Sequence, residues 1–398
     1  MPTTPTSALQ QFVQKNYNKN LAQLAFKKKL VEGYDNRFVL QQLHGKRKAK
    51  NKLPFLFNQP EVVYPATVSV EQSSSERTAA WKANLVDGDA LLDMTGGFGV
   101  DTYHFAQKIK QVHYVEKNLD LFHVVLHNFK VLNANNITLR NEDSLNFLRN
   151  TQQIFDWIYL DPARRDDVGS RKIGLVGYFP NVLVINDLLN EKAKKVLLKV
   201  SPMLDIQQAI VQLQNVRRVI VLAVQNEVKE LLLILDAKED SVTERITLET
   251  VNLLKKETEI HYQSVVNRDL SNLNYSVPKK YLYEPNAAIL KAGLFNEVAI
   301  DFNLAKLHPN THLYTSDQLD ANFPGRIFVC NAVENFNKKT VLPHLNKKKA
   351  NITTRNFPYS VAQIKKKLGI KDGGNTYLFA ATLPDDKLGI LVCEKEIN

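Results

Sequence analysis

Residues 93–101 combine acidic and glycine residues in the order Asp-Met-Thr-Gly-Gly-Phe-Gly-Val-Asp. Gly96, Gly97 and Gly99 lack Cβ atoms and tolerate positive φ, so a ligand could lie directly against the main chain here. An apolar run, 90–92, precedes this segment, and helix-compatible residues, 100–107, follow it. A strand, a glycine turn and a helix in this order predict a site for a nucleotide-like ligand.

An acidic residue is expected about 20 residues further on, where it would hold the ribose hydroxyls of such a ligand. Glu116 stands there, after the apolar segment 111–115, and a carboxylate can accept from both hydroxyls. Taken alone, Glu116 could equally be a surface carboxylate at a strand end. Asp143 follows the next strand and could accept from an adenine amino group or cap the next helix, or do both. Glu142 could replace Asp143 in the first of these roles.

The turn differs from the Gly-x-Gly-x-x-Gly pattern of hydride-transfer enzymes, because Thr95 stands at the usual first glycine. The observed pattern, Asp-x-Thr-x-Gly-x-Gly, favours a loop that grips an amino-acid group over one that cradles a pyrophosphate. Three glycines alone could simply form a tight turn. Together with Asp93 and Glu116, they predict S-adenosyl-L-methionine (SAM) as the cofactor.

Residues 161–165, Asp-Pro-Ala-Arg-Arg, follow the predicted fourth strand. Amino-group methyltransferases carry Asp or Asn, two prolines and an aromatic residue at this place. The acid and the first proline carbonyl accept from the amine, which orients it for an in-line attack at roughly 3–3.5 Å. Asp161 and Pro162 retain these groups, whereas Ala163 and Arg164 replace the second proline and the aromatic platform.

Arg164 and Arg165 could clamp a phosphate or the edge of a guanine, or pair with the acidic residues that follow them. We therefore regard Asp161, Pro162 and Arg164 as candidate catalytic residues and Arg165 as a candidate substrate contact. Ser201, in the segment 199–205 after the fifth strand, is a candidate wall of the acceptor pocket, or only a helix cap.

Alternating elements position these residues. Strands are predicted at 90–94, 111–116, 137–141, 156–161, 194–200, 217–224 and 229–236, and helices at 99–109, 119–133, 143–150, 180–191 and 204–214. The last two strands are separated by four residues and should pair as a hairpin. This order predicts a doubly wound α/β sheet, mostly parallel with a terminal antiparallel hairpin, which is the Rossmann-like arrangement of class I methyltransferases.

Four regions are expected along the 398-residue chain. Residues 1–70 form a basic helical N-terminal region, with helices in 7–53 broken near 18–20 and at Gly33. A capping box at 73–76 opens a helix that runs to about residue 83. The SAM-dependent domain covers 71–276, with strands expected at 244–253 and 258–266. A small segment, 277–323, and an α+β module, 324–398, complete the chain. In the module we expect strands at 326–331, 376–382 and 388–394 and a basic helix around 360–368.

The bulk composition excludes several other classes of protein. The longest apolar runs are far too short to span a membrane, and the N-terminus has no secretion signal. Two cysteines, Cys330 and Cys393, form neither a disulfide framework nor a metal site, so we expect no metal and a cytoplasmic location. Both lie outside the sheet domain, which disfavours methylation of a pyrimidine carbon by a cysteine nucleophile.

The net charge of +11 is concentrated near the N-terminus, where residues 1–60 hold eleven Lys and Arg against two acidic residues. A localised basic surface favours polyanions such as RNA. The same lysines could instead form a solvated helical face.

The chain as a whole resembles bacterial class I SAM-dependent methyltransferases that carry a THUMP-like C-terminal domain. The resemblance rests on the segments 74–78, 93–101, 160–166, 199–205, 281–286, 355–360 and 371–379. It implies a small ferredoxin-like piece at 277–323 and a THUMP-like domain at 324–398. THUMP domains help methyltransferases to hold RNA, usually tRNA, and lysine clusters at 347–349 and 365–367 agree with that role.

The leading hypothesis is therefore a SAM-dependent methyltransferase acting on a base nitrogen of RNA, either tRNA or rRNA. Asp93, Thr95 and the three glycines, with Glu116 and Asp143, would bind the cofactor. One alternative is a non-catalytic RNA-binding or assembly protein on a methyltransferase fold, which the altered segment 161–164 favours. Another is a methyltransferase of protein or small-molecule substrates.

Overall fold

The structure is a computed structural model that describes residues 5–164, 174–237, 246–255 and 258–396. It divides into two compact units, one within residues 1–217 and 232–244, the other within 218–231 and 245–398. Arg165 lies outside the described residues, and for Arg164 only the backbone is described.

The first unit begins with six helices: α1 (Ser7–Asn16), α2 (Leu21–Ala25), α3 (Asn36–Lys52), α4 (Pro54–Phe57), α5 (Thr67–Gln72) and α6 (Glu76–Ala83). Polar side chains cap them where the chain turns, as at Thr6, Asn20 and Asp35. Apolar side chains of α1–α3, among them Leu9 and Leu43, form a small core together with Val63. The predicted helical N-terminal region is confirmed.

One sheet of nine strands has the order β11-β10-β8-β9-β7-β4-β1-β2-β3. Its members are β1 (Ala90–Asp93), β2 (Gln111–Val115), β3 (Ile137–Arg140), β4 (Phe155–Leu160), β7 (Ala193–Val200), β8 (Val216–Val224), β9 (Glu227–Asp236), β10 (Thr247–Leu253) and β11 (Glu259–Val265). Strands β3, β2, β1, β4 and β7 pair in parallel. Buried residues such as Leu91, Ile158 and Leu197 make these strands apolar on both faces, as covered parallel strands require.

The two strands after residue 240 also join this sheet. Strand β10 runs parallel to β8, and β11 runs antiparallel to β10. The turn between β8 and β9 needs only Gln225 and Asn226, both at positive φ (50° and 65°), which suits a two-residue hairpin. The alternating α/β order and the predicted fold class are confirmed, with a sheet that is wider than the sequence indicated.

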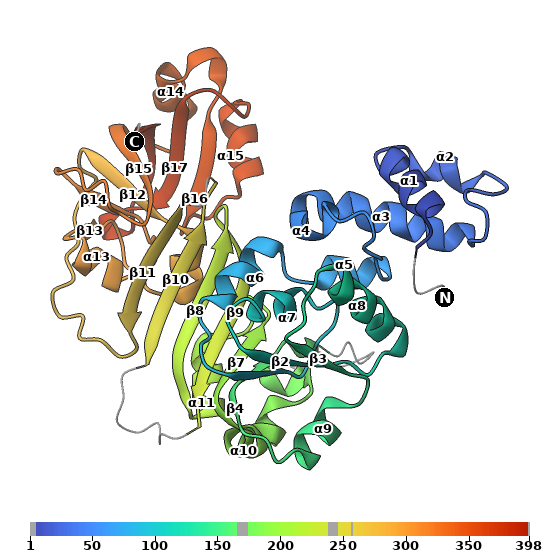
Figure 1. Ribbon diagram of the computed structural model, residues 1–398. Helices are drawn as coiled ribbons and strands as arrows, with labels where there is room; N and C mark the ends of the chain where they lie inside the picture. The colour runs from blue at the N-terminus through green and yellow to red at the C-terminus, as the bar shows by residue number, and fades with distance from the viewer. Residues whose placement is uncertain (1–4, 165–173, 238–245, 256–257, 397–398) are drawn as a thin grey trace. The chain divides into compact units, whose positions relative to one another are not determined.

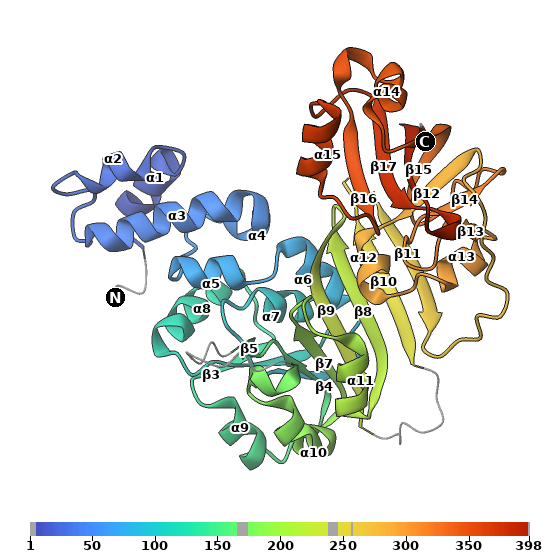
Figure 2. The ribbon, with the colours of Figure 1, turned by 180° about the vertical axis from the view of Figure 1, so that it is seen from behind.

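Five helices cover the parallel part of the sheet: α7 (Val100–Phe105), α8 (Leu119–Val131), α9 (Ser144–Asn150), α10 (Val182–Lys192) and α11 (Ile206–Leu213). In Figures 1 and 2, α7 and α8 lie on one face of the sheet and α9 and α10 on the other. A short hairpin, β5 (Ala163–Arg164) with β6 (Tyr178–Phe179), follows β4, and the single-turn helix η1 (Leu175–Gly177) precedes β6.

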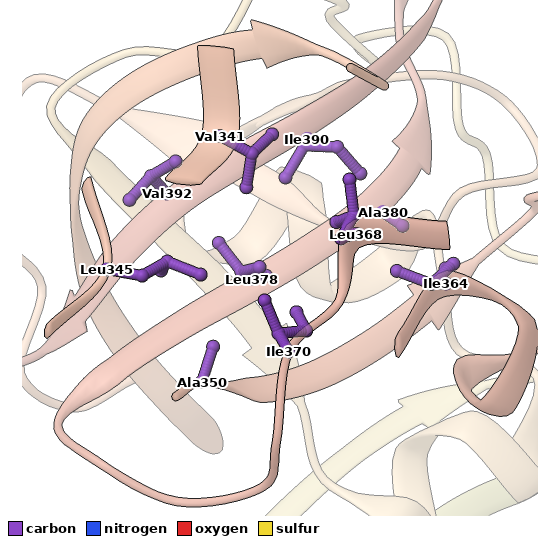
Figure 3. Close-up of a cluster of buried hydrophobic side chains, with 10 residues drawn as sticks. All are labelled: Val341, Leu345, Ala350, Ile364, Leu368, Ile370, Leu378, Ala380, Ile390 and Val392. Carbon is purple, nitrogen blue, oxygen red and sulfur yellow. The ribbon is translucent and has the colours of Figure 1, made fainter. Parts of the chain in front are cut away.

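The second unit contains a seven-stranded sheet of order β13-β14-β12-β15-β18-β17-β16. The strands are β12 (Tyr281–Pro285), β13 (Ala305–Lys306), β14 (Tyr314–Ser316), β15 (Gly325–Asn335), β16 (Asn351–Arg355), β17 (Thr376–Thr382) and β18 (Leu388–Lys395). Its helices are α12 (Ala287–Ala292), α13 (Glu297–Asp301), α14 (Lys338–Val341) and α15 (Val361–Leu368), with single turns η2 (Leu342–His344), η3 (Asn346–Lys348) and η4 (Pro384–Asp386). Ile364 and Leu368 of α15 pack on Leu378 and Ile390 of the sheet (Figure 3).

Candidate active site

A cleft of about 350 Å³ lies where strands β1 to β4 end. Parallel strands direct their carboxyl ends to the same edge of the sheet, so the residues that follow each strand meet there. The cleft is lined by all the residues proposed from the sequence to bind a cofactor, which are Asp93, Thr95, Gly96, Gly97, Gly99, Glu116 and Asp143. Asp161 lines it as well.

The glycine turn is fixed by main-chain and tyrosine contacts. The N–H of Gly96 donates to the carbonyl of Val115 at 3.1 Å, and the hydroxyl of Tyr114 donates to the carbonyl of Gly97 at 2.7 Å. Burial raises the pKa of Tyr114, so the hydroxyl remains a donor at neutral pH. Strand β2 therefore holds the turn after β1 in place.

The three glycines are required for different reasons. A Cβ on Gly96 would lie 2.2 Å from the Tyr114 ring, and one on Gly99 would lie 2.7 Å from the Phe129 ring. At Gly97, φ is +54° and a Cβ would meet only the carbonyl of Thr95, at 3.5 Å. Gly96 and Gly99 thus admit aromatic side chains from behind the turn, while Gly97 borders open space in the cleft.

Glu116 is oriented by two backbone donors. Its Oε2 accepts from the N–H of Gly97 at 3.1 Å, and its Oε1 accepts from the N–H of Asn118 at 2.7 Å. A carboxylate has about four acceptor positions, so each oxygen keeps capacity for a further donor such as a ribose hydroxyl. The half-buried side chain joins the glycine turn to the start of α8.

Asp93 and Thr95 link the ends of β1 and β4. Asp93 Oδ1 accepts from the N–H of Thr95 at 2.9 Å, and Oδ2 accepts from the Thr102 hydroxyl at 2.6 Å. The Thr95 hydroxyl in turn accepts from the N–H of Asp161 at 2.7 Å. Burial raises the pKa of Asp93 to about 7, although its hydrogen bonds oppose the rise.

Asp101 occupies the centre of a buried polar cluster that sequence reasoning missed. Its carboxylate accepts from the hydroxyls of Ser74 and Tyr159, each at 2.8 Å, and pairs with the Lys82 ammonium at 3.0 Å. Burial opposes ionisation, but the ammonium groups of Lys82 and Lys199 lower the pKa of Asp101 to about 2. Asp101 and Ser74 both belong to segments that carry the family resemblance. Nothing in the sequence indicates that they contact each other across 27 positions, and this contact reveals the cluster.

Asp161 ends β4 and pairs with a lysine from the neighbouring strand. Its Oδ2 accepts from the Lys199 ammonium at 2.5 Å, and the Lys199 side chain is 11% exposed. The loss of solvent raises the pKa of Asp161, and the positive charge of Lys199 opposes the rise. The carboxylate remains partly open to the cleft.

Asp143 is the N-cap of α9. Its Oδ1 accepts from the N–H groups of Leu145 and Asn146, at 3.0 and 3.2 Å. Since Oδ1 makes both capping bonds, Oδ2 can accept from another donor. Glu142, the alternative acid, also lines the cleft and has Arg140 at 3.9 Å.

The remaining predicted residues lie differently. Pro162 is buried and does not line the cleft, and Ser201 does not line it either. The N–H of Ser201 donates to the Tyr178 hydroxyl at 3.1 Å, and its hydroxyl accepts from the N–H of Met203 at 3.3 Å. The helix cap after Ser201 is Asp205, which accepts from the N–H of Gln208.

An aromatic residue reaches the cleft from β6. Phe179 pairs with Ala163 in the β5–β6 hairpin, and both line the cleft. The Lys117 ammonium, which follows Glu116, lies 4.9 Å from the centre of the Phe179 ring. No local pattern marks Phe179, because 14 residues lie between it and the end of the Asp-Pro-Ala-Arg segment.

The carboxylate acceptors of the cleft suit an organic ligand with hydroxyl and amino groups. Within the described residues, no group of three or more His, Cys, Asp or Glu side chains could hold a metal ion. The same part of the chain contains no helix long and apolar enough to cross a membrane.

Family models and solved structures of known proteins are similar to this chain or to parts of it. A ferredoxin-like domain family matches residues 281–324, and a family described as THUMP domain-like matches 325–395. The crystal structure of a candidate methyltransferase from Porphyromonas gingivalis W83 is 30% identical, covers 98% of both chains and has a TM-score of 0.87. No curated protein matches the chain in sequence.

Smaller methyltransferases match part of the chain. An rRNA methylase from Streptococcus thermophilus is 14% identical over 40% of this chain and 93% of its own, with a TM-score of 0.30. TrmK from M. capricolum, solved with S-adenosylhomocysteine, is 13% identical over 41% of this chain and 69% of its own, with a TM-score of 0.32. A likeness of this extent carries no weight for substrate or activity.

Proposed function

The chain belongs to the class I methyltransferase family with a THUMP-like C-terminal domain, and from this premise we propose that it methylates a base nitrogen of RNA with SAM as the methyl donor. The observation that carries the proposal is the convergence of Gly97, Glu116 and Asp161 on one cleft at the carboxyl ends of the strands. When bound, SAM supplies an electrophilic methyl group. The chain supplies binding and orientation.

The cofactor fits the donors and acceptors of the cleft. Glu116 would accept from the ribose hydroxyls, because the Gly97 and Asn118 N–H groups hold its carboxylate in position. Asp143 Oδ2 would accept from the adenine amino group. The main chain at 95–97 would contact the amino-acid end, because Gly97 adds no Cβ to that wall.

The acceptor nitrogen would lie at Asp161. A carboxylate that accepts from an amine directs the nitrogen lone pair, and such positioning supplies much of the rate gain in a displacement reaction. The Lys199 ammonium favours the ionised form of Asp161 and so opposes the effect of burial, and the Thr95 hydroxyl fixes the Asp161 backbone. Arg164 and Arg165 would contact the substrate, whereas Pro162, which does not line the cleft, is given no acceptor role here.

The RNA would be held mainly outside the cleft, by the basic region 1–70 and the THUMP-like domain proposed at 324–398. The cofactor and acceptor would bind to the domain proposed at 71–276, and 277–323 would form the ferredoxin-like segment before the THUMP-like domain. Positive charge for a polyanion comes from Lys347–Lys349, just before β16, and from Lys365–Lys367 of α15.

Tritiated methyl transfer from SAM to total small RNA tests this proposal. Wild-type protein should transfer label, and Asp161→Ala should lose at least about tenfold in rate, as loss of a charged hydrogen bond at the reacting group predicts. Asp120→Ala is the matched control, since this exposed acid of α8 does not line the cleft. No transfer by the wild type to any RNA pool would contradict the proposal.

A second function is favoured by one observation. The Asp161 carboxylate is already paired with Lys199, and the segment after it lacks the second proline and the aromatic residue. An RNA-binding or assembly protein that no longer catalyses would show this arrangement. RNA binding by both wild type and Asp161→Ala, with no methyl transfer by either, would support that function.

A further inference from the structure

Phe26 is a large aromatic side chain held almost entirely in water. It is the C-cap of α2 and is 91% exposed, more than any other large apolar side chain of the described residues. A phenylalanine that gives up no surface to the fold adds no burial energy. An exposed aromatic of this kind is therefore a candidate contact for a binding partner.

The loop that carries this ring is ordered by Asn36, from the first turn of α3. The Asn36 amide donates to the carbonyl of Lys27 at 2.9 Å, and its Oδ1 accepts from the N–H of Leu30 at 2.9 Å. The N–H of Lys27 also donates to the carbonyl of Leu24 at 3.1 Å. The backbone around the ring is thus arranged in advance, which lowers the ordering cost of binding.

The loop presents lysine side chains to the solvent, whereas several cationic side chains of α3 are hydrogen-bonded to main-chain carbonyls. Lys46 and Arg47 donate to main-chain carbonyls, and Lys52 donates to the carbonyl of Val70 at 2.9 Å. Lys27 and Lys28 are exposed and form no ion pair within the described part of the chain. The charge left for a polyanion therefore includes two lysines directly beside the Phe26 ring.

A hollow of about 450 Å³ adjoins the loop. Leu21 and Ala25 of α2 line it, together with Arg37, Leu40 and His44 of α3. Arg37 is exposed and brings a third positive charge to this surface. The surface thus combines an aromatic face, several cations and a concavity, which is the composition of single-strand nucleic-acid sites.

We propose that Phe26, Lys27, Lys28 and the adjoining hollow bind a single-stranded segment of RNA, with the ring stacked on a base and the cations at phosphates. This inference deepens the proposed function and rests on RNA being the substrate. A membrane surface is less favoured, because a single aromatic residue offers too little apolar area for stable insertion.

The test measures binding of the full chain to a short fluorescein-labelled single-stranded oligouridylate over a range of salt concentrations. Phe26→Ala should lower the affinity about tenfold at every salt concentration, and Phe26→Trp should retain it, because stacking does not depend on counterions. Lys27→Ala and Lys28→Ala should each reduce the slope of log affinity against log salt by about 0.7. Val184→Ala, at a residue 78% exposed, and Lys130→Ala are the controls and should change neither quantity.

An affinity that is unchanged in Phe26→Ala overturns the inference, as does a salt slope that is unchanged in both lysine variants. Binding to phosphatidylserine vesicles that is lost in Phe26→Ala, with RNA binding intact, also overturns it. The outcome is separable from the proposed function. Loss of RNA affinity in Phe26→Ala supports the site even if no RNA is methylated, and wild-type transfer with unchanged affinity in Phe26→Ala overturns only the site.

Discussion

The ionisation state of Asp161 controls the chemistry proposed for the cleft. Its carboxylate must be ionised to accept from an amine, because protonation turns an acceptor oxygen into a donor. Burial raises its pKa, and the Lys199 ammonium counteracts that rise. The ion pair therefore sets the pH at which the proposed acceptor site begins to work.

The pH dependence of kcat/KM tests this role. As the pH falls through the raised pKa of Asp161, the rate of methyl transfer should fall, so the acid limb should lie above the usual Asp range. Lys199→Ala removes the opposing charge and should move that limb to higher pH. Lys195→Ala, on the same strand but exposed, is the control and should leave it in place. An acid limb that does not move in Lys199→Ala would show that the pair does not tune Asp161.

Asp101 and Lys82 supply a prediction about stability. Lys82 is fully buried and pairs with Asp101, so Asp101→Asn removes the charge of this partner and should lower the free energy of unfolding by about 3–5 kcal/mol. The pKa of Asp101 is lowered to about 2, so its contribution is present above the usual Asp pKa and is lost as the pH falls towards 2.

Urea denaturation at several pH values measures this effect. Asp89→Asn is the control, because its partner Lys110 is exposed and the loss should be near zero. A loss below about 1 kcal/mol in Asp101→Asn at neutral pH would contradict a buried, paired carboxylate.

At the scale of elements, the glycine turn between β1 and α7 meets two requirements, which are packing against β2 and space for a ligand in the cleft. Gly96 is required by the Tyr114 ring behind the turn, and Gly97 borders the cleft in front. The fold and the proposed cofactor thus constrain neighbouring residues separately. Substitution at each position should reveal which requirement it meets.

Gly96→Ala should lower the free energy of unfolding by about 1–3 kcal/mol, because the Tyr114 ring must shift. Gly97→Ala should cost only about 1 kcal/mol, for the positive φ, but should weaken SAM binding by placing a methyl group in the cleft. Gly33→Ala, with φ +81° and no neighbour within 4 Å, is the control for backbone strain alone. Equal SAM affinity of Gly97→Ala and Gly33→Ala would remove Gly97 from the cofactor wall.

Local patterns predicted most elements of this region within one or two residues. Strand β2 was expected at 111–116 and spans Gln111–Val115, since its apolar residues and flanking loops are local signals. The capping box at 73–76 is wrong: Ser73 ends α5, and Ser75 caps α6 by accepting from the N–H of Thr78. The intervening Ser74 donates to Asp101, a contact between distant residues that no local rule reports.

At the scale of the whole molecule, the second unit has a core of its own. Leu378 and Ile390 of its sheet pack against Ile364 and Leu368 of α15, and all four are buried (Figure 3). A basic helix was expected around 360–368, and α15 spans Val361–Leu368. Strand β16 and helix α14 were not predicted, because their short mixed sequences bury few residues.

Leu378→Ala tests whether this core supports RNA binding independently of the cleft. The substitution should lower the free energy of unfolding of the second unit by about 2–5 kcal/mol and weaken RNA binding, while SAM affinity stays unchanged. Leu388→Ala, at a residue 39% exposed, is the matched control. Amide hydrogen exchange would show which residues lose stability in the variant. Loss of SAM affinity in Leu378→Ala would contradict the separation of roles.

The width of the nine-stranded sheet also lay beyond local prediction. The segments of β10 and β11 were expected as strands, but the pairing of β10 with β8, which joins both to the sheet, depends on contacts between residues far apart in the chain. The same limit applies to the site. The spacing of the motifs predicted that Gly97, Glu116 and Asp161 share one site. Lys199 reaches Asp161, and Phe179 reaches the cleft, through strand pairing that only the folded chain defines.

Titration calorimetry of the protein with SAM tests the central claim that the cleft after β1 and β2 binds this cofactor. The wild type should bind one SAM per chain. Glu116→Ala should lose affinity by about tenfold to a hundredfold, as the loss of a charged acceptor predicts, and Asp120→Ala, at an exposed acid that does not line the cleft, should bind as the wild type does. The absence of binding by the wild type, or equal binding by Glu116→Ala, would contradict the account.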